Sequence, residues 1–367
     1  MFITRLLPLC GMALSAIVAM TLVTTVVASP VGNLYVERVP VADQQAAARS
    51  DAATIGMAPV LVRVSGSSTV LLNSDIQRAI NKASRYLSKF SYQKTPLQPD
   101  TTAEGEEQLP YSLELQFRKP AILNLLRASN EPIWAEDRPA TLMWLVVDDL
   151  IGRRLPFDDD ETGLRQIVEA SAARRGLPLV WPVYDLQEQA TLSLDSLWAA
   201  DPKTIELASQ RYDAIGTLLG RLLGTSDGKW RVAWEYSFNG ASTYWDSECE
   251  RLDDCVAGPI DAVAELLSSR YALISTDQGN IAKVKVAGIN SFEDYGSLLF
   301  YFEDLIAVSD VALDTINGDV FEFTLGLTAD REKLEELISL NKRLLPVPTV
   351  EGSDVTISDN SLVYQWR

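Results

Sequence analysis

The sequence predicts a mixed α+β and α/β protein, with three small modules in tandem and a ferredoxin-like last module. Two observations support this prediction. Short apolar runs alternate along the chain with segments of helical periodicity, which is typical of strands covered by helices. The composition is that of an ordinary globular protein, with 47% hydrophobic and 22% charged residues. A chain of 367 residues is also long enough for about two or three domains.

Residues 1–28 have the features of a signal peptide. One positive charge, at Arg5, precedes an apolar run over residues 6–27, and Val26-Val27-Ala28 fits the small-residue cleavage pattern. This run is longer than the usual secretory core, so an uncleaved inner-membrane anchor remains an alternative. Both interpretations place the rest of the chain in the periplasm. No later apolar run is long enough to span a membrane, and we expect no further span.

The first module is predicted over residues 33–130. Alternation indicates a strand at 34–41, and Asp43 is placed to cap the helix that follows it. A second helix is expected from Asn73, because apolar residues recur at helical spacing as far as Leu87. The remaining expected elements are a loop at 94–108, a strand at 111–117 and a short helix at 120–128.

The central module is predicted over residues 138–275. Thr141–Asp149 is an unbroken apolar run that ends in two acids, as expected of a strand buried on both faces. Residues 179–185 and 215–223 have a similar form, and Asn239-Gly240 marks a hairpin turn. The strands of that hairpin are expected at 230–238 and 242–245, and helices at 163–174, 194–212 and 259–271.

The third module is predicted over residues 281–367. Its expected elements follow the order β-α-β-β-α-β, which is the ferredoxin-like plan. They lie at 281–287, 291–305, 308–315, 320–327 and 330–340, and the last strand comes from 343–350 or from 362–366.

Composition excludes several classes of function. Fifty acidic against 32 basic residues give a net charge of −18, which disfavours nucleic acid and anionic lipid as partners. The chain contains no histidine, so Ser-His-Asp and Cys-His nucleophiles and histidine-ligated metal sites are excluded. We predict no cofactor and no metal, and the absence of histidine favours a protein that is not an enzyme.

Two cysteines, Cys249 and Cys255, remain after the leader. A close pair in an exported protein predicts a disulfide that closes a small loop, and a free, buried pair is the alternative. Metal binding is less favoured, because two thiolates without histidine make a poor site.

Asp148, Asp149 and Asp185 are the only catalytic candidates, and they are weak ones. Each follows an apolar run, at the position where open α/β sheets often carry binding groups. Paired carboxylates there would do acid–base work, whereas the alternative is that these acids simply begin loops.

Three other patterns each have a functional and a structural interpretation. The acid run Asp158–Glu161 fits either a cation site or favourable charges at the start of a helix. Gly216, Gly220 and Gly224 fit a glycine-containing strand better than a membrane helix. The tryptophans crowded around the central module predict either sugar stacking or an aromatic core; they are Trp134, Trp144, Trp181, Trp198, Trp230, Trp234 and Trp245.

Several short motifs together resemble a known family. They lie at residues 40–49, 133–139, 144–149, 174–178 and 211–222, and include Trp144-Leu145-Val146-Val147-Asp148-Asp149. The chain resembles, over nearly all of its mature length, the proteobacterial domain of unknown function 2066. The resemblance implies an exported protein with no assigned activity and no catalytic residues to carry over. The central module is more distantly similar to envelope binding and scaffolding proteins, namely the flagellar T-ring assembly factor and penicillin-binding-protein activators.

The sequence therefore predicts a non-catalytic periplasmic protein that binds another cell-envelope component and helps its assembly or maintenance. The expected partner is a protein, bound by exposed sheet edges and by the grooves between modules. Two alternatives remain. One is a hydrolase of a cell-wall saccharide that uses Asp148, Asp149 and Asp185. The other is a small-molecule binding protein with a pocket lined by the central tryptophans.

Overall fold

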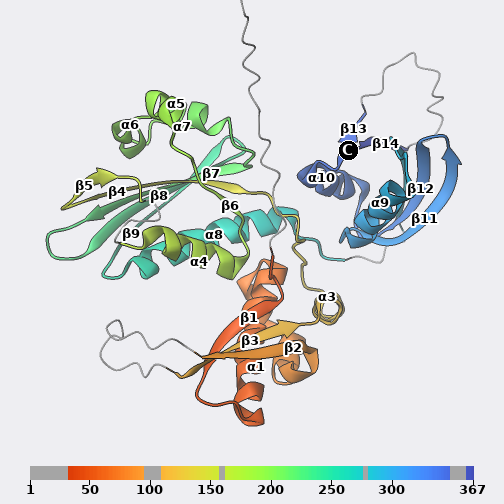
Figure 1. The fold of residues 1–367 in the computed structure, drawn as a ribbon, viewed down its shortest axis with the longest axis horizontal. Coiled ribbons are helices and arrows are strands. Elements are labelled where there is room, and N and C mark those ends of the chain that lie inside the picture. The colour runs from red at the N-terminus through yellow and green to blue at the C-terminus, as the bar shows by residue number, and fades with distance from the viewer. Residues whose placement is uncertain (1–31, 95–108, 157–161, 276–279, 348–360) are drawn as a thin grey trace, which may run out of the picture.

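The computed structural model describes residues 32–94, 109–156, 162–275, 280–347 and 361–367. Three separate sheets of three, six and five strands lie along the chain. Each sheet has its own helices, so the predicted mixed fold class is confirmed (Figure 1). The predicted leader lies outside the described residues. In the part of the chain that the structure describes, no helix is long and apolar enough to cross a membrane.

The N-terminal module is an antiparallel sheet in the order β1-β3-β2 with the long helix α1 packed on it. The buried face of α1 includes Met57, Leu61 and Val64. The elements are β1 (Val36–Val41), α1 (Ala46–Ser65), α2 (Ser74–Ile80), β2 (Leu87–Lys94), β3 (Tyr111–Phe117) and α3 (Lys119–Ala128), with 3-10 turns η1 (Ser68–Leu72) and η2 (Ala83–Tyr86).

Two predictions for this module are wrong. Asp43 does not cap the first helix, because the N-cap residue of α1 is Gln45 and no side chain caps that end. The helix expected to continue through Leu87 ends at Ile80, and Leu87 begins strand β2. β2 pairs antiparallel with β3, so the partner strand supplies hydrogen bonds that the local helical spacing does not reveal. Of the predicted loop at 94–108, residues 95–108 lie outside the described residues.

The C-terminal module follows the ferredoxin-like plan with one variation. Both segments proposed for the last strand are strands: β14 lies beside β10 and runs parallel to it, and β13 forms the edge of the sheet. The sheet order is β11-β12-β10-β14-β13. The elements are β10 (Asn280–Ala287), α9 (Phe292–Asp304), β11 (Val308–Asn317), β12 (Val320–Leu327), α10 (Arg331–Asn341), β13 (Leu344–Pro346) and β14 (Leu362–Trp366).

The central module is a sheet with helices on both faces (Figure 1). Its strands follow the order β5-β4-β7-β8-β9, and β6 also pairs with β4. The strands are β4 (Thr141–Asp149), β5 (Gly152–Arg154), β6 (Leu179–Val180), β7 (Gly216–Gly224), β8 (Trp230–Phe238) and β9 (Ala241–Cys249). The helices are α4 (Leu164–Arg175), α5 (Leu186–Thr191), α6 (Leu194–Trp198), α7 (Pro202–Ser209) and α8 (Leu252–Tyr271).

Burial of strand β4 on both faces explains its unbroken apolar sequence. Met143, Leu145 and Val147 pack with α4 and α8 on one face. Trp144 and its even-numbered neighbours Leu142 and Val146 pack with α6 and α7 on the other. Successive side chains of a strand point to opposite faces, so a strand covered on both sides is apolar at every position.

The structure corrects three predicted boundaries in this module. The strand expected at 179–185 is only the short β6. The helical region 194–212 divides into α6 and α7, because Asp201 caps a new helix whose first residue is Pro202. The last helix begins at Leu252, and Pro259 lies inside it.

A buried arginine joins the N-terminal and central modules. Arg138, which is 2% exposed, donates hydrogen bonds to the carbonyls of Arg63 (2.8 Å), Trp134 (3.1 Å), Arg175 (3.1 Å) and Gly176 (2.9 Å). These carbonyls include the C-terminal turns of α1 and α4, where helix carbonyls lack partners and the helix dipole is negative. Burial lowers the pKa of the Arg138 guanidinium to about 9, so it is still charged at neutral pH.

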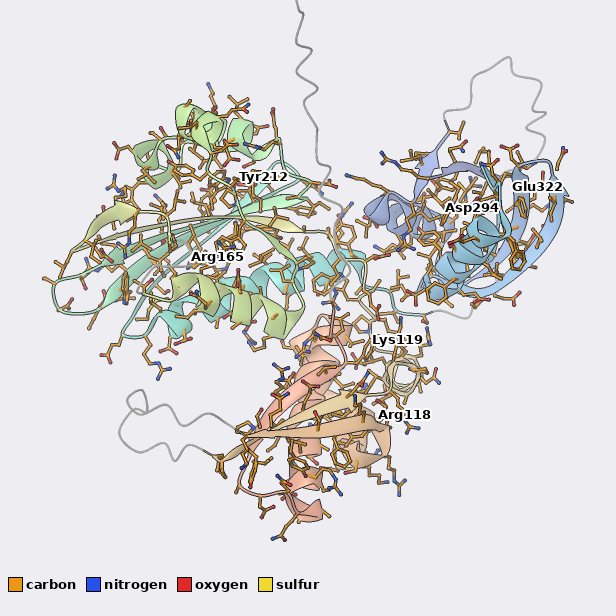
Figure 2. All side chains as sticks on the ribbon, viewed as in Figure 1. Arg118, Lys119, Arg165, Tyr212, Asp294 and Glu322 are labelled. Carbon is orange, nitrogen blue, oxygen red and sulfur yellow. A yellow bond between two sulfur atoms is a disulfide. The ribbon has the colours of Figure 1, made fainter. Side chains whose placement is uncertain are left out.

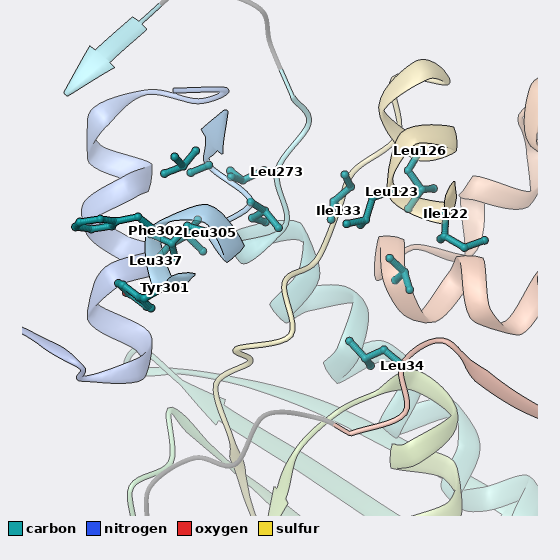
Figure 3. Packing of buried hydrophobic residues seen from close by; sticks show 14 of the residues in the cluster. Leu34, Ile122, Leu123, Leu126, Ile133, Leu273, Tyr301, Phe302, Leu305 and Leu337 are labelled. Carbon is teal, nitrogen blue, oxygen red and sulfur yellow. The ribbon is translucent and has the colours of Figure 1, made fainter. Parts of the chain in front are cut away.

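The N- and C-terminal modules also meet. Ile133 and Leu273 exchange two backbone hydrogen bonds of 2.8 and 2.9 Å and form an isolated antiparallel bridge. Side chains of α3, α9 and α10 belong to the same apolar cluster as these two residues (Figure 3). Lys119 of α3 adds ion pairs to Asp304 of α9 (2.7 Å) and to Glu136 (3.1 Å).

Candidate functional site

The central sheet carries a groove on the face that α6 and α7 cover only in part. Leu219 of β7 packs with Ile205 and Ala208 of α7. Farther along the same face the β9 side chains are exposed, including Tyr244, which is 63% exposed. Two pockets lie where the helices end and the uncovered strands begin, with volumes of about 630 Å³ and about 500 Å³. We call them the larger and the smaller stretch of the groove.

The larger stretch lies at the start of β7. One wall is α7, with Ile205 and Ser209, and the floor includes Thr217 and Ser237. It extends to the β8–β9 turn at Asn239 and Gly240, and its lining combines apolar and hydrogen-bonding groups. Mixed lining of this kind is typical of binding sites.

A polar network holds the wall of this stretch in place. The Tyr212 hydroxyl donates to the carboxylate of Glu188, which is 2% exposed, and accepts a hydrogen bond of 2.8 Å from the Val183 backbone. Arg211 lies 3.3 Å from the same carboxylate. Burial, and then the hydrogen bond to Glu188, raise the pKa of Tyr212 above its usual range, so the hydroxyl stays a donor. Tyr212 is thus fixed beside α7, above the sheet (Figure 2).

The smaller stretch lies over the other end of β7 and is crossed by one row of residues. Arg221 of β7 lies opposite Ala233 of β8, and Ala233 lies opposite Asp246 of β9. The wall is Trp198 at the end of α6, whose carbonyl accepts a hydrogen bond of 3.0 Å from Arg221. The Arg153 guanidinium lies 4.6 Å from the Trp198 ring, which fixes the orientation of that ring.

Asp148 and Asp149, the candidate acids at the end of β4, are both paired with arginine. Arg153 donates to Asp148 at 2.7 and 3.1 Å. Arg154 donates to Asp149 at 2.7 and 3.1 Å, and this contact is the main reason why the pKa of Asp149 is lowered. Neighbouring acids that share a proton would raise one pKa, and no such arrangement is present between these two residues as the structure describes them.

Asp185 is a helix cap. Its carboxylate accepts hydrogen bonds from the backbone N–H groups of Gln187 (3.1 Å) and Glu188 (3.0 Å), and Arg211 lies at 2.9 Å. The backbone of Glu188, and next Arg211, lower the pKa of Asp185. The structure therefore gives each of the three candidate acids its own partner at a turn or cap, and does not assemble them into one site.

The other sequence patterns have structural explanations where they are described. Trp134, Trp144 and Trp234 are fully buried core residues, as the aromatic-core interpretation expected, and Trp198 lines the groove. Gly216, Gly220 and Gly224 lie in strand β7, where Gly220 faces the Trp234 ring across the strand pair. The acid run Asp158–Glu161 lies outside the described residues.

Cys249 at the end of β9 and Cys255 in the first turns of α8 are bonded through their sulfur atoms, with Cα atoms 5.9 Å apart. This link ties the edge strand below the groove to the helix that covers the opposite face of the sheet. Over the described ranges no group of three or more cysteine or acidic side chains is placed to hold a metal ion.

Sequence reasoning missed the groove itself. Arg221, Ala233 and Asp246 lie on three different strands, and no local pattern links them. The one available signal is the Asn239-Gly240 turn, because a fixed hairpin turn sets which residues of β8 and β9 lie opposite each other.

Comparison with known proteins divides the chain into matched ends and an unmatched middle. Residues 28–135 match a domain of unknown function, DUF8605, and residues 268–367 match DUF2066. No curated protein matches the chain. A solved structure described as "Crystal structure of uncharacterized protein" is similar over 37% of this chain and 93% of its own, at 9% identity. The TM-score between the two structures is 0.17.

The DUF2066 match supports the family indicated by the sequence motifs over residues 268–367 only, and not over nearly all of the mature chain as expected. The match covers the C-terminal module, whereas the motifs that carried the resemblance lie within residues 40–222. The chain therefore carries a DUF2066 domain over residues 268–367 and a DUF8605 domain over residues 28–135, both of unknown function.

Proposed function

We propose that this is an exported, non-catalytic periplasmic protein that binds a segment of another cell-envelope protein in the groove of its central module. The observation that carries the proposal is the groove: a fixed helical wall stands beside an uncovered part of the sheet, in two adjoining stretches of about 630 and 500 Å³. Signal-peptide features in residues 1–28 support export.

The shape of the groove favours an extended polypeptide. Its floor follows β7 from Thr217 to Leu223. Six residue steps of about 3.3 Å give a length of roughly 20 Å, which matches about six residues of extended chain. Extended segments that lie along sheets are a recurrent mode of peptide recognition.

Hydrolysis has no corresponding observation in its favour. A general acid at neutral pH needs a raised pKa, whereas the pKa values of Asp149 and Asp185 are lowered by their partners. Asp148 is held by Arg153. Binding is therefore the function that the described geometry supports best.

Photo-crosslinking from inside the groove tests the proposal. A benzophenone amino acid is placed at Ser237, which is exposed on the groove floor, and at Ala170 as a control, which is exposed on α4 at the opposite face. We expect a crosslinked protein of one defined mass from Ser237 and not from Ala170. We expect Gln210→Trp, which fills the groove from an exposed position at the end of α7, to abolish the product without changing the melting temperature. Equal products from both positions, or none from Ser237, would contradict the proposal.

Export is tested separately. Cell fractionation and the intact mass of the purified protein report where the chain resides and where it begins. We expect a periplasmic protein that begins at Ser29. A full-length chain in the inner membrane supports the anchor alternative, and a full-length chain in the cytoplasm refutes export.

A further inference from the structure

The smaller stretch of the groove contains two charges without charged partners. Arg221 makes no ion pair with any residue that the structure describes, and its guanidinium donates one hydrogen bond, to the Trp198 carbonyl. The Nε of Arg221 is buried without an acceptor. Across the groove, Asp246 has neither an ion pair nor a side-chain hydrogen bond within the described ranges.

The other two charged residues that line this stretch, Arg231 and Glu248, pair with each other. Glu248 lies 3.1 Å from Arg231 and 3.4 Å from Lys229, and these two cations lower its pKa. Glu235 lines the larger stretch, not this one, and accepts a hydrogen bond of 3.1 Å from the Tyr244 hydroxyl. The stretch therefore presents one unmatched positive charge on one side and one unmatched negative charge on the other.

Strand register fixes how far apart these charges are. Arg221, Ala233 and Asp246 are directly opposite one another on three neighbouring strands. Neighbouring strands lie about 4.8 Å apart, so the Cα atoms of Arg221 and Asp246 are roughly 10 Å apart. The short side chain of Ala233 between them leaves the floor of the groove low, with room for a chain.

A half-buried guanidinium without an acid retains its desolvation cost, and a carboxylate is the group that best offsets it. Arginine binds carboxylates through two parallel charge-assisted hydrogen bonds. Consecutive side chains of an extended segment point to opposite sides. An acidic residue directed at Arg221 thus places the next residue of the segment toward Asp246.

We propose that the row Arg221–Ala233–Asp246 selects the bound segment by charge, and that it takes an acidic and a basic residue that are adjacent in the partner's sequence. The acid binds Arg221 and the base binds Asp246, with the segment lying over Ala233. This inference rests on the proposed function and specifies the chemistry of its partner.

Two synthetic peptides with fluorescent labels test the inference. One is Gly-Ser-Glu-Lys-Ser-Gly, and the other replaces the charged pair by Gln-Gln. Fluorescence anisotropy against the purified full chain measures both affinities. We expect the charged peptide to bind about tenfold or more tightly than the neutral one, with a preference that weakens as salt is added.

Substitutions in the row provide the matched controls. We expect Arg221→Gln and Asp246→Asn each to remove most of the preference for the charged peptide. The exchanged pair, Arg221→Glu with Asp246→Lys, should instead prefer the reversed peptide Gly-Ser-Lys-Glu-Ser-Gly over the neutral one. Asp246→Asn alters an exposed side chain that has no ion pair or side-chain hydrogen bond among the described residues, so the fold is expected to survive, and thermal melting checks this. A wild-type chain that binds both peptides equally, or neither, overturns the inference.

The two proposals fail in different ways. If Ser237 yields its crosslinked partner but Arg221→Gln and Asp246→Asn leave the yield unchanged, the groove binds a protein without this charge selection. If Ser237 yields no partner while the charged peptide still binds selectively, the row recognises the charged pair, but the proposed function is wrong.

Discussion

Adding a single methyl group at Gly220 should destabilise the central module. An ideal Cβ there would lie 2.6 Å from the Leu145 Cδ1 and 2.6 Å from the Trp234 Cζ3. Ordinary contacts between carbon atoms are about 3.5–4.0 Å, so each neighbour would have to retreat by about 1 Å. Both are 1% exposed and closely surrounded. Overpacking of this kind costs about 1–3 kcal/mol, and replacing a strand glycine by alanine returns about 0.5–1 kcal/mol.

We therefore expect Gly220→Ala to lower the free energy of unfolding by about 1 kcal/mol, which corresponds to a melting temperature lower by roughly 3–5 °C for a module of this size. Urea unfolding followed by far-ultraviolet circular dichroism measures the change. Gly296→Ala is the control, because Gly296 lies in α9 with no atom within 4 Å of its added Cβ. That substitution should stabilise α9 by about 1 kcal/mol through helix propensity.

A double-mutant cycle locates the cause. Trp234→Phe removes the ring atoms that the new Cβ would meet, so its combination with Gly220→Ala should cost less than the sum of the two single changes, by about 1 kcal/mol. A neutral Gly220→Ala, or strictly additive effects, would refute the packing argument.

Three further predictions concern the joints and ends of the molecule. Arg138→Met leaves the carbonyls at two helix ends without their donor, and we expect a loss of about 3–5 kcal/mol and separate unfolding of the N-terminal module, seen as a second transition in calorimetry. Reduction of Cys249–Cys255 should cost about 2 kcal/mol from the short loop it closes, measured as a lower urea midpoint, while unreduced peptide mapping should recover the two cysteines linked. The pKa values of Asp149 and Asp185 are lowered on folding, so their contribution to stability is present above the ordinary aspartate pKa of about 3.9 and is lost as the pH falls below it. Urea midpoints between pH 3 and pH 7 should show this loss, and Asp149→Asn should reduce it; an unchanged profile would contradict the assignment.

The sequence predicts best those elements whose pattern is local. Residues 142–147 are apolar at every position because both faces of strand β4 are covered, and that condition is visible in the residues themselves. Strand β2 was missed because the spacing from Ile76 to Leu87 fits a helix, and only the pairing with β3 decides otherwise. Propensity is weak where a distant partner supplies the hydrogen bonds.

The candidate site was beyond local reasoning for a related reason. Asp148 and Asp149 stand out because they follow a buried strand, but the arginines that pair with them come from the next strand of the hairpin. Arg221 and Asp246 are inconspicuous in sequence, and only the register of three strands places them in one row. Charge pairing and strand register are properties of the folded chain, so residue type alone does not reveal them.

The bridge between Ile133 and Leu273 means that the chain enters and leaves the central module at one point. Topologically the module is an insertion whose two ends touch, while the flanking modules share an apolar cluster of their own. A tight turn of about two residues in place of 134–272 would thus leave a two-module protein that keeps the Ile133–Leu273 bridge. The boundaries of the two family matches, at residues 135 and 268, fall beside that bridge.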